Sequence, residues 1–201
     1  MNEDTYRQQA FDQSTHLSAP GSPSATSGVC HLFALKWASL IVSDKSLGTG
    51  ARIGELDRHA SEVRILYKSF GDRWNREGGK RADEGIAKTL GLKIDKLEEP
   101  GTKAIVHAHV RAEHRVAFVY SFWWADGSGH SIGVYRSGAK YGGHIYVFEP
   151  NFGEYKMKKS QFGDWLTWLE GSYASGPFAA HQLRHFSAYE QKAVAGGVKV
   201  M

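Results

Sequence analysis

The segment from Val116 to Pro150 constrains the fold most, because it holds three β-rich runs separated by short glycine-containing turns. The runs read VAFVYSFWW, HSIGVYR and HIYVFEP, and the turns between them read ADGSG and SGAKYGG. β-Branched and aromatic residues favour strands, and short connections join antiparallel neighbours. We therefore predict a three-stranded antiparallel meander, to which GEYKM at 153–157 adds a fourth strand.

Helical patterns flank this sheet in the sequence. Apolar residues recur every three or four positions in CHLFALKWASLIV, which predicts a buried helix with Ser27 as its N-cap and an end near Ser43. A longer pattern predicts one helix over residues 54–75. Shorter helices are expected at 81–90, 102–111 and 160–171, although TKAIVHAHV in the second of these also fits a strand. Helices followed by an antiparallel sheet indicate an α+β fold.

The first 27 residues differ in composition from the rest of the chain. They are polar, rich in Ser, Ala, Gly and Pro, and lack both periodicity and the apolar stretch of a secretory signal peptide. We expect 1–27 to be a flexible leader and 28–201 to be one domain, because 201 residues with 41% hydrophobic content suffice for a substantial core. No run approaches 18 consecutive apolar residues, so no transmembrane helix is expected.

Charge and cysteine content exclude several functional classes. The net charge of +4 comes from basic residues interleaved with acids, without a recognisable nucleic-acid-binding motif, so nucleic acid is not an expected partner. The single cysteine excludes an intramolecular disulfide and a multi-cysteine zinc site. His107 and His109 alternate without an acidic partner in a known motif, so we expect neither a metal nor a cofactor.

The hairpin of residues 130–149 brings a histidine and a carboxylate together. If Val134 lies opposite Ile145, then His130 lies opposite Glu149 on the same face of the sheet, with Cβ atoms about 4.5 to 5.5 Å apart. Such a pair closes many hairpins without any catalytic role, and it becomes catalytic only beside a nucleophile. Asn151 is a second candidate for orienting the histidine, although Pro-Asn fits a turn more simply.

Cys30 supplies a candidate nucleophile. It occupies the first turn of the predicted helix, where unpaired backbone N–H groups and the helix dipole favour a thiolate. Gly28 allows a sharp turn into the helix and the close approach of a substrate. A lone cysteine is more often a small buried apolar residue. The chain order of cysteine, histidine and carboxylate is nevertheless that of the Cys-His-Asp/Asn arrangement in papain-like enzymes.

These residues also carry a resemblance to a known family. GVCHLFALKW, GHSIGVYR and YVFEPNFGEY resemble, in order, three blocks of the YopT-type effector cysteine proteases, papain-like enzymes that bacterial type III secretion delivers into host cells. The blocks are a Gly-x-Cys at a helix start with a Trp seven residues later, a strand that begins His-x-Ile, and a hydrophobic pair before Asp-Pro-Asn-x-Gly-Glu and an aromatic residue. The resemblance spans about 28–170 and implies Cys30, His130 and Glu149 as catalytic residues.

The sequence departs from this family pattern at two points. The family's third catalytic residue is Asp, whereas this chain has Glu149, so the sequence alone predicts that Glu149→Asp preserves or raises activity. The side-chain donor of the oxyanion hole has no clear counterpart either. Ser24, Thr26 and Ser27 are hydroxyls rather than amides, and Gln13 lies far upstream, so we leave this donor unassigned.

The resemblance implies a cysteine endopeptidase that cleaves a host protein. It also implies export from a bacterium without a Sec signal peptide and action in the host-cell cytosol. Two other functions stay open: deamidation or acyl transfer by the same three residues, and a catalytically impaired papain-like domain that serves as a binding module.

Overall fold

The computed structural model describes residues 5–17, 28–44, 46–138 and 143–188. Within them, the strands are β1 (Arg7–Gln9), β2 (Leu92–Glu98), β3 (Val116–Trp123), β4 (Gly129–Arg136), β5 (His144–Glu149), β6 (Gly153–Lys158) and β7 (Ala180–Ala188). The helices are α1 (Gln13–Leu17), α2 (Val29–Ser43), α3 (Thr49–Arg58), α4 (Ala60–Glu77), α5 (Gly79–Thr89), α6 (Lys103–Ala112) and α7 (Phe162–Ser172), the last preceded by a 3-10 turn at Lys159–Gln161.

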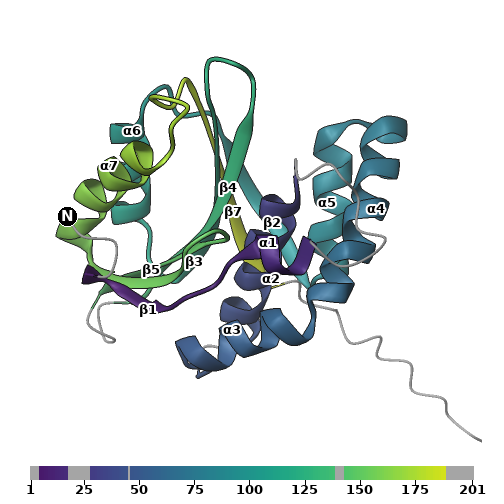
Figure 1. Ribbon diagram of the computed structural model, residues 1–201, viewed down its shortest axis with the longest axis horizontal. Coiled ribbons are helices and arrows are strands. Elements are labelled where there is room, and N and C mark those ends of the chain that lie inside the picture. The colour runs from purple at the N-terminus through teal and green to yellow at the C-terminus, as the bar shows by residue number, and fades with distance from the viewer. Residues whose placement is uncertain (1–4, 18–27, 45, 139–142, 189–201) are drawn as a thin grey trace, which may run out of the picture.

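The strands form one antiparallel sheet with helices on both faces. Its order is β1-β6-β5-β4-β3-β7-β2, and Figure 1 shows α2 to α5 on one side and α6 and α7 on the other. Each face buries its own apolar cluster, around Phe33 and Trp37 of α2 on one side and Phe162 and Trp165 of α7 on the other. Burial of each such side chain contributes on the order of 1.5–3 kcal/mol. The predicted α+β class is confirmed.

Most predicted helices and the central strands are present, and the helix expected over 102–111 is confirmed, but the longest predicted helix is interrupted. The helix expected over 54–75 is two helices that meet at His59, whose imidazole is hydrogen bonded to Glu62 at 2.6 Å and paired with Glu55 at 3.1 Å. The apolar pattern runs across the break, and no glycine or proline marks it. Residues 103–112 form a helix rather than a strand, and the Thr102 hydroxyl caps it by accepting from the backbone N–H of Ile105.

Strands β2 and β7 were not predicted, and the reason lies in their polar side chains. β7 runs between β3 and β2, yet its buried residues include His181, Arg184 and His185. Each of these has a buried or half-buried partner, so the strand tolerates polar groups without the alternation that signals a sheet. The predicted meander is therefore the centre of a wider sheet.

Part of the expected flexible leader is folded. β1 pairs with β6, and Phe11 is buried with its ring against those of Phe33 and Phe148. Gly153 permits the close approach, since it has φ 122° and a Cβ there would lie 2.0 Å from the carbonyl oxygen of Gln9. A few apolar contacts hold this segment, which explains why its composition resembled a leader. Residues 1–4 and 18–27 lie outside the described ranges.

Among the residues that the structure describes, no helix is both long enough and apolar enough to cross a membrane.

Candidate active site

Cys30 lies in the first turn of α2, as predicted. The helix begins at Val29 behind Gly28, whose φ of 98° is a conformation that suits glycine. The thiol is buried and accepts a backbone hydrogen bond from Ser131, the residue after His130 in β4. The N-cap is Gly28 rather than the expected Ser27, which lies outside the described residues. Helix α2 therefore presents Cys30 to the start of β4.

His130 and Glu149 lie together on one face of the sheet, although the predicted register is wrong by two residues. Val134 pairs with Val147 rather than with Ile145, and the β4–β5 ladder reaches only as far as Gly133 and Phe148. A shift of two residues preserves the face to which each side chain points, whereas a shift of one would reverse it.

Glu149 consequently reaches His130 diagonally along the strands instead of directly across them. Its Oε1 accepts a hydrogen bond from the Nε2 of His130, and its Oε2 accepts from the backbone N–H of Asn151 at 2.8 Å. The glutamate side chain is one methylene longer than that of an aspartate. The other ring nitrogen of His130, Nδ1, is left for the thiol of Cys30, with which the imidazole is hydrogen bonded.

The three groups shift one another's protonation in the direction that a nucleophile requires. Burial acts to raise the pKa of Cys30, but the charge of His130 and its hydrogen bond outweigh it, and the thiol pKa is lowered. Burial acts to lower the pKa of His130, but Cys30 and Glu149 outweigh it and raise that pKa to about 10. Both shifts favour a thiolate–imidazolium pair, the reactive form of a cysteine nucleophile.

Tyr173 is a part of this site that the sequence did not indicate. It follows α7, and its hydroxyl donates to Glu149 Oε1 at 2.8 Å and accepts from the side-chain amide of Asn151 at 3.1 Å. Burial and the neighbouring carboxylate raise the pKa of Tyr173, so the phenol stays protonated and can donate. Gln13 donates to the side-chain oxygen of Asn151 at 2.7 Å and extends this chain to α1. No motif or periodicity marks Tyr173 in GSYASG.

Asn151 supports Glu149 and lies in a turn, as the Pro-Asn sequence predicted. Gln13, considered as an oxyanion donor, has its amide N–H engaged by Asn151. The other candidates, Ser24, Thr26 and Ser27, fall outside the described residues. The donor therefore stays unassigned.

A second buried polar network lies on the α2 side of the sheet. His31, next to Cys30, is hydrogen bonded to Asp83 of α5 at 2.9 Å, and Asp83 accepts from Arg184 of β7 at 2.8 Å. Arg184 continues to the hydroxyl of Ser121 at 3.3 Å, which shares a 2.7 Å bond with that of Ser131. The backbone N–H of Ser131 also donates to the Cys30 thiol, so this network connects Cys30 to the sheet.

The tryptophans divide between the core and the surface. Trp124 and Trp165 are buried in the α7-side cluster. Trp123 lines a cavity of about 400 Å³ at the end of β3 and β7, together with His181.

The fold is similar to that of a solved bacterial protein. The crystal structure of the Pseudomonas avirulence protein AvrPphB superposes with a TM-score of 0.70 at 14% identity, covering 93% of this chain and all of that one. PatoxP, a cysteine protease-like domain of the Photorhabdus asymbiotica toxin PaTox, matches with a TM-score of 0.47 at 14% identity, over 92% of this chain and 55% of that one. No protein-family model and no curated protein sequence matches the chain. The fold is papain-like, and the predicted resemblance is confirmed at the level of the fold.

Proposed function

We propose that this chain is a papain-like cysteine protease in which Cys30 is the nucleophile, His130 the general acid and base, and Glu149 the residue that orients His130. The observation that carries the proposal is the convergence of these three side chains at a helix start and a sheet end. A buried cysteine with a lowered pKa beside a charged imidazole is typical of an activated nucleophile rather than of a core residue.

In the first half of the reaction, the Cys30 thiolate attacks the carbonyl carbon of a peptide bond. The carbon–sulfur bond forms, and the carbonyl electron pair moves to the oxygen, which lies against the backbone N–H of Cys30 at the start of α2. The imidazolium of His130 then donates its Nδ1 proton to the leaving amine as the carbon–nitrogen bond breaks, and a thioester on Cys30 remains.

In the second half, neutral His130 removes a proton from a water molecule as its oxygen attacks the thioester. The carbon–sulfur bond breaks, the carboxylic acid leaves and the thiolate–imidazolium pair is restored. Glu149 keeps the Nε2–H of His130 directed at itself throughout, so that Nδ1 faces the reacting atoms.

The biological setting that we propose is a host cell into which a bacterium delivers the protein, with a host protein as substrate. Similarity to the fold of a Pseudomonas avirulence protein supports this setting.

The experiment compares the full chain with its Cys30→Ala variant in a host-cell extract, with new protein N-termini identified by mass spectrometry. We expect new termini only with the unaltered chain. The matched control is Ser43→Ala, at the other end of α2, where the hydroxyl bonds only helix carbonyls. Equal cleavage by Cys30→Ala would refute the proposal. A small mass change in a partner without a new terminus would instead indicate deamidation or acyl transfer.

A further inference from the structure

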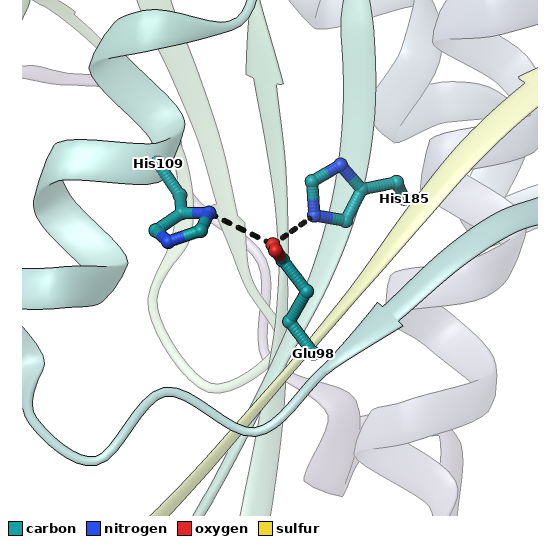
Figure 2. Close-up of side chains that lie close together, drawn as sticks. All are labelled: Glu98, His109 and His185. Carbon is teal, nitrogen blue, oxygen red and sulfur yellow. Dashed lines mark hydrogen bonds and ion pairs between the residues drawn. The ribbon is translucent and has the colours of Figure 1, made fainter.

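A second group of ionisable side chains lies where β2, β7 and α6 meet. Glu98 is the last residue of β2, His185 lies on β7 and His109 lies on α6. Figure 2 shows both imidazoles directed at the carboxylate of Glu98. His185 lies two strands away from β4, level with Val134, which is four residues along β4 from His130. Strand and residue spacings place it roughly 17 Å from His130. The group is therefore separate from the candidate active site.

The geometry of this group is convergent. Nδ1 of His109 lies 2.8 Å from Glu98 Oε2, and Nε2 of His185 lies 2.7 Å from the same oxygen. The three atoms lie within 4.8 Å of one another. The ring of Phe118 packs against that of His185 with centroids 4.8 Å apart, which holds the imidazole in this orientation.

The surroundings leave one side of the group open. The side chain of His185 is 6% exposed and that of Glu98 15%, whereas that of His109 is 34% exposed. Lys96 pairs with the other oxygen of Glu98 and is 57% exposed, so it can move into solvent. Partial burial acts to raise the pKa of Glu98, but Lys96 and the two histidines outweigh it and keep the pKa low.

We propose that Glu98, His109 and His185 form a binding site for a divalent transition-metal ion, with Zn²⁺ as the preferred occupant and water as a fourth ligand. Two imidazole nitrogens and one carboxylate oxygen are an established ligand set for zinc with an open position. Imidazole nitrogen selects zinc over magnesium and calcium, which prefer oxygen alone.

Binding requires only a small rearrangement. Zinc lies about 2.0–2.2 Å from nitrogen and oxygen ligands, so ligands around one ion are farther apart than hydrogen-bonded atoms. The half-exposed His109 can withdraw to admit the ion, while His185 stays fixed by Phe118. The ion would join β2, β7 and α6 at an edge of the sheet, which the sequence did not reveal because the acidic partner of His109 lies on a different element.

The test measures Zn²⁺ binding to the untagged full chain by calorimetry, in a Cys30→Ala background that removes the thiol as a ligand. We expect one ion per chain, a cobalt spectrum typical of four-coordinate geometry, and no comparable binding of Mg²⁺ or Ca²⁺. At a Zn²⁺ concentration a hundredfold above Kd, the melting temperature should rise by about 5 to 10 °C. His109→Ala and Glu98→Gln should each weaken binding about tenfold or more.

Two variants sharpen the test. His59→Ala is the matched control, because His59 has similar exposure and two carboxylates within reach but no second imidazole in its pairs. Its affinity for Zn²⁺ should be unchanged. Lys96→Ala should tighten binding several-fold, since it removes a cation from Glu98. The absence of stoichiometric binding, equal affinity in His109→Ala, or loss of binding in His59→Ala would each overturn the proposal.

Discussion

Shortening Glu149 to aspartate tests the reach of this side chain. The sequence predicts that activity is preserved or raised, whereas the structure predicts that it falls. The carboxylate of Glu149 already contacts His130 from a diagonal position. Removal of one methylene withdraws it by about 1.5 Å, a carbon–carbon bond length. The 2.8 Å bonds from Asn151 and Tyr173 would then exceed the range of a hydrogen bond unless the backbone moved. We therefore expect Glu149→Asp to impair the site.

The magnitude follows from the bond that is lost. A hydrogen bond between charged groups contributes about 1.5–3 kcal/mol, which corresponds to a reduction in rate of about 10- to 150-fold. Loss of this bond removes one of the influences that raise the pKa of His130, so that pKa should fall. Glu149 also repels the Cys30 thiolate, but this is the weakest influence on that pKa. An imidazolium that deprotonates more easily stabilises the thiolate over a smaller pH range, so the pKa of the Cys30 thiol should rise. The pH range in which the thiolate–imidazolium pair exists should therefore narrow at both its acidic and its basic limit.

The assay is the rate of alkylation of Cys30 by iodoacetamide as a function of pH, read by intact-mass spectrometry, since the chain has one cysteine. Glu149→Gln is the companion variant, because it keeps the length of the side chain and removes its charge. Glu170→Asp is the matched control, a half-buried carboxylate that pairs with Lys103 instead. An unchanged or wider pH range in Glu149→Asp, with an intact fold by circular dichroism, would refute the reasoning.

Two further predictions concern Tyr173 and the buried ion pair of Arg52 with Glu154. Tyr173→Phe removes a donor to Glu149 and should slow alkylation and peptide cleavage by about 2- to 10-fold without unfolding the chain; an unchanged rate would show that the hydroxyl does not help to hold the carboxylate. Glu154→Ala leaves the guanidinium of Arg52 buried without its carboxylate partner, so the free energy of unfolding in urea should fall by about 3–5 kcal/mol. A loss under about 1 kcal/mol would contradict the second prediction.

The sequence predicted the site better than it predicted the sheet. Cys30, His130 and Glu149 meet as the sequence predicted, because their proposed roles depend on residue type, chain order and face, and these survive a register error of two residues. Tyr173 was missed because it acts from an irregular segment after α7, where neither periodicity nor a motif constrains its identity.

Strand β7 was missed for a different reason. Several of its buried side chains are polar and are satisfied by partners from other elements, such as Asp83 for Arg184 and Glu98 for His185. Sequence patterns register burial through apolar residues, so a strand stabilised by long-range ion pairs gives no such signal. The fold of residues 5–17 was not predicted either, because only a few apolar contacts, around Phe11, hold this segment and they form no sequence pattern.

The candidate site draws on every layer of the molecule. Cys30 belongs to the helices on one face, His130 and Glu149 to the sheet, and Tyr173 to the end of α7 on the opposite face. A partly unfolded form that loses the α2 layer separates the thiol from its imidazole, and one that loses the α7 layer releases a restraint on Glu149. The reactivity of Cys30 at neutral pH should therefore fall when either helical layer leaves the sheet, even if the other layer stays folded. Comparing this loss with global unfolding shows whether the layers unfold cooperatively.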